Sequence, residues 1–220
     1  METAKTNHHY HIRGDMTREE YINYPAISAS RIKRFYTGDI SINKSVKAAL
    51  DKGAAFHHQL LETDPSEMSK DAYNVYNAIC SNAMLEALFN GSQKEMIVVD
   101  EIVIPYLDGS TQHILGKGML DMVYHENKII VDIKTTTCKT IEQFAKDMLE
   151  HCNHIQAVWY SMLMGWTPKD FYYIGVPQKA KKNGSTSSDL FLYRHSDDEL
   201  THAIQLIANF LEQFDGDFDR

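Results

Sequence analysis

The chain has 220 residues, of which 43% are hydrophobic and 24% are charged. These are ordinary globular values, and they argue against a disordered chain, a collagen-like repeat or a coiled coil. The net charge of −8, from 22 basic and 30 acidic residues, does not by itself indicate a polyanionic partner. The longest apolar stretch, residues 155–166, is too short to span a membrane, and the polar N-terminus lacks the apolar region of a signal peptide.

Length and cysteine content indicate one domain in a reducing compartment. The chain has the length of one domain and no Pro/Gly-rich linker divides it, so we expect a single domain over 1–220 with flexible ends at 1–15 and 216–220. An odd number of cysteines without C-x-x-C spacing predicts a cytoplasmic location and excludes a four-cysteine metal site within one chain. The three are Cys80, Cys138 and Cys152.

The first 90 residues predict helices. Thr17 and Glu20 have the spacing of a capping box, and a serine, Ser28 or Ser30, could cap a short helix that runs through Phe35. Apolar residues at helical spacing then predict two longer helices. Their expected ranges are 46–62 and 66–90, with Gly91 closing the second.

The middle of the chain predicts a sheet, and helices return after it. Apolar runs and alternating patterns predict strands at 96–105, 114–124, 128–135, 171–176 and 190–193, with a turn at 107–110. Helical periodicity predicts helices at 140–150, 154–165 and 197–214. The economical interpretation is one α/β domain.

The hairpin around residues 118–136 carries the strongest chemical signal. If Glu126 and Asn127 form a two-residue turn, Asp121 lies directly opposite Asp132. Lys134 shares the face of Asp132, because strand side chains alternate. Two carboxylates this close repel each other unless a cation such as Mg²⁺ or Mn²⁺ lies between them. The alternative for this motif alone is an exposed cluster of acidic and basic side chains.

Two helical patterns add candidates. His57 lies on the apolar stripe of its helix, one turn after Gly53, while His58 points about 100° away. Gln156 and Tyr160 are four residues apart on one helix, so both side chains can contact the same neighbouring group. Each pattern alone is equally compatible with ordinary core packing.

These motifs together resemble the PD-(D/E)xK nuclease superfamily, and more narrowly its RecE branch, the exodeoxyribonuclease VIII type related to the RecB nuclease domain. The resemblance covers residues 10–165 and also includes the segment 24–30. It implies an α/β restriction-endonuclease-like core, with a mixed central sheet flanked by helices and an N-terminal helical segment. The motifs are Gly53-x-x-x-His57-x-x-Leu-Leu-Glu62, Asp121, Asp132-Ile-Lys134-Thr-Thr136 and Gln156-x-x-x-Tyr160.

The resemblance also implies roles for individual residues. His57, Asp121, Asp132 and the Ile133 carbonyl would bind Mg²⁺, with Mn²⁺ as a substitute. Lys134 would contact the scissile phosphate, and the pair Gln156 and Tyr160 would orient Lys134 or the DNA strand. Further candidates are Thr135 and Thr136 for DNA contacts, and Glu62 and Glu95 as additional acids.

The expected activity is metal-dependent exonucleolytic hydrolysis of linear double-stranded DNA in phage-type recombination or repair. The alternatives are an endonuclease of the same superfamily and a non-catalytic DNA-binding partner of a single-strand annealing protein. A single-strand annealing partner and a ring-shaped homo-oligomer are implied by the resemblance alone. Because the average charge is negative, we expect DNA binding to use the bound metal and a local basic surface, in which Lys44 and Lys47 are solvent-exposed. Its members are Arg31, Lys33, Arg34, Lys44, Lys47 and Lys52.

Overall fold

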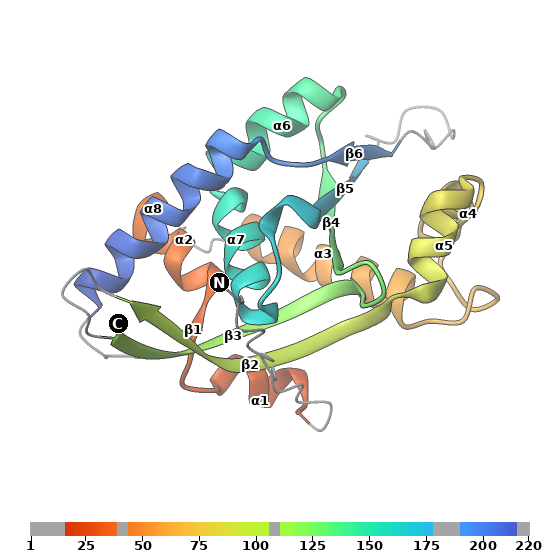
Figure 1. Ribbon diagram of the computed structural model, residues 1–220. Coiled ribbons are helices and arrows are strands. Elements are labelled where there is room, and N and C mark those ends of the chain that lie inside the picture. Colours follow the sequence, from red (N-terminus) through yellow and green to blue (C-terminus); the bar gives the residue numbers. More distant parts are fainter. Residues whose placement is uncertain (1–15, 39–43, 106–110, 178–189, 215–220) are drawn as a thin grey trace.

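The computed structural model describes residues 16–38, 44–105, 111–177 and 190–214 (Figure 1). The predicted flexible ends and the turn at 107–110 lie outside the described residues, as does the side chain of Lys44. Within the described part of the chain, none of the helices has the length and apolar character needed to cross a bilayer. Cys80, Cys138 and Cys152 are free thiols.

A mixed six-stranded sheet forms the centre of the molecule. The long hairpin of β2 and β3 pairs antiparallel, β3 continues antiparallel into β4, and β4 pairs parallel with β5. The short strand β6 pairs antiparallel with β5, and β1 pairs parallel with β3. The strands are β1 (Ile27–Ser28), β2 (Gln93–Pro105), β3 (Thr111–Tyr124), β4 (Ile129–Thr136), β5 (Phe171–Pro177) and β6 (Phe191–Tyr193).

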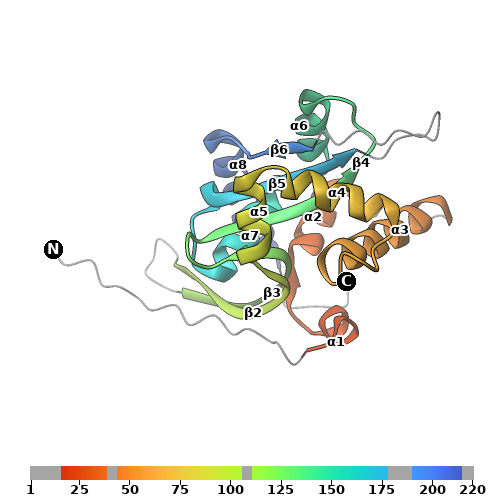
Figure 2. The same ribbon diagram turned by 90° about the vertical axis from the view of Figure 1, so that its right-hand side faces the viewer.

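Helices cover both faces of this sheet, as Figures 1 and 2 show. One apolar cluster joins one face to α7, α2, α6 and α8, and a second cluster joins the other face to α3, α4 and α5. The predicted mixed sheet flanked by helices is therefore confirmed. The helices are α1 (Arg18–Asn23), α2 (Ala29–Thr37), α3 (Lys44–Leu61), α4 (Lys70–Cys80), α5 (Ala83–Gly91), α6 (Ile141–Glu150), α7 (Asn153–Met164) and α8 (Asp197–Gln213), with a short 3₁₀ turn at Pro168–Asp170.

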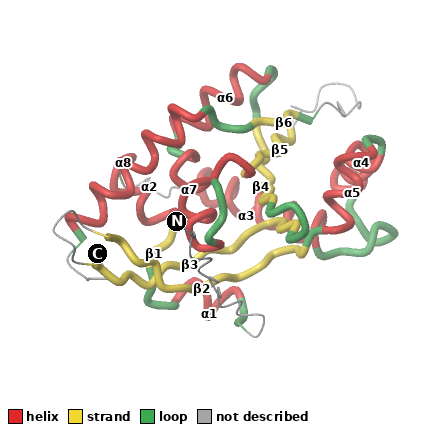
Figure 3. Tube along the Cα trace, viewed as in Figure 1, coloured by secondary structure: helices red, strands yellow, loops and turns green. Residues whose placement is uncertain are grey.

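The predicted single helix over 66–90 is wrong. It is two helices, α4 and α5, and Figure 3 shows them as separate segments. Ser69 caps the first, and Asn82 caps the second by accepting hydrogen bonds from the backbone N–H groups of Met84 (3.1 Å) and Leu85 (3.2 Å). An asparagine that satisfies the first N–H groups of a new helix competes with continuation of the preceding one. Gly91 belongs to α5 itself and does not cap it.

Caps set the boundaries of the N-terminal helices. Thr17 and Glu20 form the predicted capping box of α1, with both reciprocal hydrogen bonds present. Of the two candidate serines, Ser28 caps α2 by accepting a hydrogen bond from Arg31 N at 3.3 Å. The end of α1 is then fixed to the sheet by Lys117, whose ammonium donates to the carbonyls of residues 21, 22 and 24 at 2.8–3.0 Å.

Close packing of α7 on β3 positions the helix that carries Gln156 and Tyr160. A Cβ atom at Gly118 would lie 2.9 Å from Leu163 and 3.0 Å from the Tyr160 ring, so only glycine fits without displacement. Trp159 donates its indole N–H to the Lys117 carbonyl at 3.2 Å, which fixes the helix along the strand. This arrangement brings α7 within side-chain reach of the β3–β4 hairpin.

Candidate active site

The β3–β4 hairpin has the predicted register but a longer turn. Met122 pairs with Val131, and the two following pairs keep the same register. The strands are joined by residues 125–128, rather than by 126–127 alone, and Lys128 has a φ of 57°. Two residues added symmetrically to the turn leave every pair in place, so the register prediction is confirmed although the turn length was wrong.

The two aspartates lie just beyond the end of this ladder. In the same register Asp121 and Asp132 would form the next pair, but Asp121 Oδ2 instead accepts a hydrogen bond from the backbone N–H of Ile133 at 2.7 Å. Both aspartates are buried. Val131 and Ile133 point into the apolar cluster under α3 to α5, as their alternation with Asp132 predicts.

The neighbouring strand β2 is irregular at the same level. Its pairing with β3 lacks one step between the pairs Lys94–Met122 and Met96–Leu120, where Glu95 faces Asp121. Glu95 has a φ of 47°, a left-handed conformation that is uncommon and costly for a residue with a side chain. This local break turns the Glu95 carboxylate toward Asp121, and such strain is often found at functional sites.

His57 completes a cluster of three candidate metal ligands. One ligand atom from each of His57, Glu95 and Asp121 lies within 4.8 Å of the other two, and His57 Nδ1 is 3.4 Å from Asp121 Oδ2. Burial and the Asp121 charge raise the pKa of Glu95 to about 7. Burial works against protonation of His57, but its hydrogen bond with Asp121 raises the pKa overall. Two neighbouring carboxylates beside an imidazole are a donor set that fits a divalent cation.

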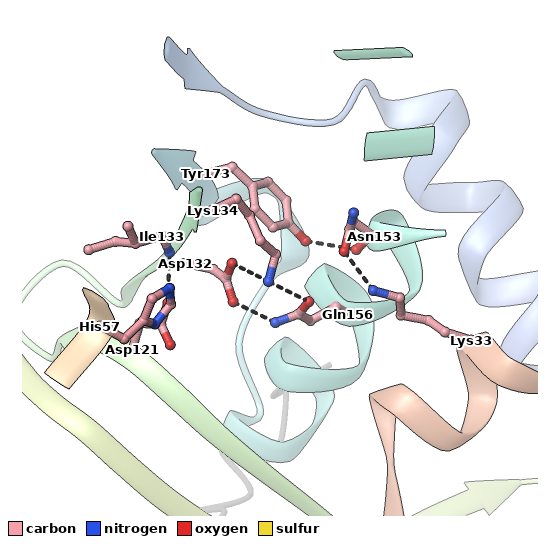
Figure 4. Close-up of polar contacts among 9 residues, drawn as sticks. All are labelled: Lys33, His57, Asp121, Asp132, Ile133, Lys134, Asn153, Gln156 and Tyr173. Atoms are coloured by element: carbon pink, nitrogen blue, oxygen red, sulfur yellow. Dashed lines mark hydrogen bonds and ion pairs between the residues drawn. The ribbon is translucent and has the colours of Figure 1, made fainter. Parts of the chain in front are cut away.

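Asp132 belongs to a second polar group beside this cluster (Figure 4). Asp132 Oδ1 accepts a hydrogen bond from Gln156 Nε2 at 2.5 Å, and Oδ2 lies 2.6 Å from Lys134 Nζ. Lys134 in turn donates to Gln156 Oε1 at 3.2 Å, which closes a three-membered network. Burial raises the pKa of Asp132, and the Lys134 ammonium opposes that rise. Gln156 therefore orients both charged groups.

Tyr160 and Thr135 lie at the margin of the site, and Thr136 lies in its wall. The Tyr160 ring packs against Gly118, and burial together with the nearby carboxylates raises the pKa of its hydroxyl well above the usual range. Thr135 is half-buried beside Gly53 of α3. Thr136 is buried, and its Oγ1 accepts a hydrogen bond from Cys138 N at 3.1 Å. A buried hydroxyl used in this way stabilises the strand end, which argues against the predicted DNA contact by Thr136.

The predicted basic surface is only partly exposed. Arg34, Lys47 and Lys52 are exposed, whereas Arg31 is half-buried with its guanidinium 5.2 Å above the Phe214 ring. The Lys33 side chain points inward and donates to Asn153 Oδ1 at 2.6 Å, so it is not part of the exposed surface.

The predicted apolar stripe of α3 is also buried only toward its C-terminal end. Leu60 and Leu61 belong to the second apolar cluster, but Leu50 is 60% exposed because the first half of α3 extends beyond the sheet. On the same helix His57 faces Asp121, while exposed His58 pairs with Glu62 at 3.3 Å. The helix phase predicted for His57 therefore agrees with the structure.

The family follows from a comparison of the sequence with family models. Residues 42–187 match the model described as a PDDEXK-like domain of unknown function (DUF3799). The chain belongs to this family. The match spans the cluster of His57, Glu95 and Asp121 as well as Asp132, Lys134 and Gln156, and it supports a nuclease in general. The predicted superfamily is thereby confirmed, whereas the narrower RecE-type assignment stays a prediction.

One solved structure supports the fold. The crystal structure of a "Putative exonuclease" from Eubacterium rectale superposes with a TM-score of 0.52 at 15% sequence identity, covering 90% of this chain and 84% of that one. A more distant structure, SSO0001, has a TM-score of 0.34 at 11% identity and covers 84% of each chain. The search of curated proteins finds no match. At 15% identity the similarity to the Eubacterium rectale structure shows a shared fold and nothing more specific.

Proposed function

We propose that this protein is a metal-dependent deoxyribonuclease that hydrolyses phosphodiester bonds from the ends of linear double-stranded DNA. The observation that carries the proposal is the position of the His57–Glu95–Asp121 cluster directly beside the Asp132–Lys134 pair. Cation ligands and an ammonium group then face the same space, which is what hydrolysis of an anionic ester requires. The similarity to the Eubacterium rectale protein favours the exonucleolytic mode.

The cation would be held by His57, Glu95 and Asp121, with Asp132 and the Ile133 carbonyl as additional ligands. Mg²⁺ suits the carboxylates, and Mn²⁺ tolerates the imidazole as well. A divalent ion bound there would supply Lewis-acid stabilisation of the phosphate and lower the pKa of water. Glu95 would take part in this ligand set, whereas the resemblance implied His57, Asp121, Asp132 and Ile133 as ligands and left Glu95 as a further acidic candidate.

The remaining side chains would position the substrate and stabilise charge. Lys134 would place its ammonium beside a phosphate oxygen, where negative charge increases during hydrolysis. Gln156 would hold Lys134 and Asp132 in place through the hydrogen bonds of its amide group. Tyr160 would limit access of water from the α7 side, because its buried ring fills the space over Gly118.

A pair of variants in β2 tests the metal-dependent chemistry. Glu95→Gln removes a charge from the cluster, and Glu101→Gln removes one from the exposed part of the same strand, where Glu101 contacts His113 at 3.0 Å. We expect Glu95→Gln to lose Mn²⁺ binding and DNA cleavage, and Glu101→Gln to retain both. Equal activity of the two variants would exclude Glu95 from the site.

The mode of cleavage is tested with linear and closed circular duplexes in Mg²⁺. Degradation of the linear DNA alone is the expected result. Cleavage of both substrates would indicate an endonuclease, and cleavage of neither would indicate a DNA-binding module without turnover. The recombination setting, the single-strand annealing partner and the ring-shaped oligomer rest on the RecE-like resemblance, and light scattering of the purified protein tests the last of these.

A further inference from the structure

Lys33 is a second lysine close to the site, although it comes from a different part of the chain. It lies on α2, before the residues that the family model matches, and its ammonium donates to Asn153 Oδ1 at 2.6 Å (Figure 4). Burial and the positive charge of Lys134 lower the pKa of Lys33 to about 8, and the negative charge of Asp132 partly opposes this. Lys33 is therefore within electrostatic range of both Lys134 and Asp132.

One helix positions both lysines. Asn153 begins α7, and its carbonyl accepts a hydrogen bond from the Tyr173 hydroxyl of β5 at 2.7 Å, so the residue that holds Lys33 is itself fixed. Gln156, which holds Lys134, follows three residues later on the same helix. Residues three apart lie on one helix face. The two ammonium groups are thus presented from neighbouring points of a rigid, buried helix.

The two ammonium groups interact with each other and with the same carboxylate. Lys33 and Lys134 repel each other, and Asp132 is the carboxylate that attracts both. A cation bound by the neighbouring carboxylates would increase the positive charge further. An anion that contacts both ammonium groups would relieve this repulsion, just as a cation relieves repulsion between paired carboxylates.

We propose that Lys33 binds an internal phosphodiester of the DNA strand, adjacent to the phosphate that Lys134 contacts. This inference rests on the proposed nuclease function and adds a second phosphate contact, supplied by α2. The competing explanation is structural, namely that Lys33 only joins α2 to α7 through Asn153. In the first explanation DNA binding depends on the charge of Lys33. In the second, only the hydrogen bond between Lys33 and Asn153 is needed, and it serves the fold.

Lys33→Gln separates these explanations, because glutamine can still donate to Asn153 but carries no charge. Lys146→Gln is the matched control, since Lys146 is 77% exposed on α6 and the net charge changes equally. Binding of a short labelled duplex is measured at several salt concentrations, both in Ca²⁺ and in EDTA. We expect Lys33→Gln to weaken binding on the order of fivefold and to reduce the salt slope by about one. Lys33→Arg should retain the wild-type values.

Equal affinity and slope for Lys33→Gln and Lys146→Gln would overturn the proposal. A duplex with 5′-phosphoryl ends and one with 5′-hydroxyl ends should respond equally to Lys33→Gln. An effect confined to the duplex with 5′-phosphoryl ends would indicate that Lys33 binds a terminal phosphate. That result would refute the assignment of Lys33 to an internal phosphodiester.

Reductive methylation of the wild-type protein provides a test that needs no variant. Bound DNA should protect Lys33 and leave Lys146 unchanged, and modification of Lys33 at the same rate with and without DNA would contradict the proposal. The nuclease function is judged separately, by Mg²⁺-dependent cleavage with the wild-type protein. Lys33-dependent binding without cleavage would refute the function but not the phosphate contact.

Discussion

Replacing Lys134 by methionine should destabilise the metal-free protein, because it leaves the Asp132 carboxylate buried without its ion-pair partner. Asp132 is 3% exposed, and the Lys134 side chain is 28% exposed. Removing one partner of a buried pair costs about 3–5 kcal/mol. Gln156 still donates to Asp132 in the variant and Lys134 is partly solvated, so we expect a loss of about 2–3 kcal/mol. For a chain of this length that corresponds to a decrease in Tm of about 5–10 °C.

Divalent metal should reverse part of this loss. Lys134 competes with a cation for Asp132 and repels one in the neighbouring cluster, so Mn²⁺ should bind the Lys134→Met variant more tightly than the wild type. A tenfold gain in affinity would add about 1.4 kcal/mol of stability at saturating metal. The increase in Tm upon addition of Mn²⁺ should therefore be larger for the variant, while DNA cleavage is lost.

Thermal unfolding in EDTA and in Mn²⁺, together with calorimetric titration of Mn²⁺, measures these effects. Lys146→Met is the control, and it should change neither Tm nor the metal response. Asp132→Ala should act in the opposite way, by weakening Mn²⁺ binding. An equal decrease in Tm of Lys134→Met with and without metal, or weaker Mn²⁺ binding, would refute the assignment of Asp132 to the metal site.

Three further predictions concern other parts of the molecule. His57→Ala should abolish Mn²⁺ binding and cleavage, whereas exposed His58→Ala should leave both within about twofold by titration and nuclease assay. Burial lowers the pKa of His154 to about 4, so wild-type stability should begin to fall as the pH drops below 6.5, and the loss should be complete below pH 4. The full pKa change corresponds to roughly 3 kcal/mol of stability, and solvent screening reduces this to about 2 kcal/mol. In urea unfolding at each pH, the free energy of unfolding of His154→Leu should therefore fall less steeply with decreasing pH than that of the wild type. Replacing exposed Lys47 and Lys52 by Glu should weaken duplex binding in Ca²⁺ and lower the slope of its salt dependence by up to about two. An unchanged slope would show that Lys47 and Lys52 do not contact the DNA.

The parts of the fold that local sequence determines were predictable. The capping box at Thr17 and the serine cap at Ser28 fix the starts of their helices by contacts within a few residues. The break between α4 and α5 does not follow from periodicity, because the apolar pattern continues across it and only the cap at Asn82 marks the new helix.

The site was predictable to the extent that it depends on one hairpin and on helix phase. The register that opposes Asp121 and Asp132 is set by the short connection between two neighbouring strands. The resemblance implied that Gln156 orients Lys134, and the two side chains are hydrogen-bonded, but the hydrogen bond of Gln156 to Asp132 depends on how α7 packs against the sheet. That packing relies on Gly118 and on other contacts between distant segments, which periodicity alone does not reveal.

The sequence analysis named Glu95 only as an additional acid and Lys33 only as part of the basic surface, although pairing and helix rules place both more closely. The register of β2 against β3 places Glu95 opposite Asp121. The pairing rule that places Asp121 opposite Asp132 therefore also predicts Glu95 as a third neighbouring carboxylate, if it is applied to the β2–β3 hairpin. Lys33 follows buried Ala29 by four residues on α2, which puts it on the buried face of that helix. A charged side chain in a buried helical position needs a partner, and its partner Asn153 lies 120 residues away. Helix periodicity therefore places Lys33 on a buried face, but only the tertiary structure shows that it lies near Lys134.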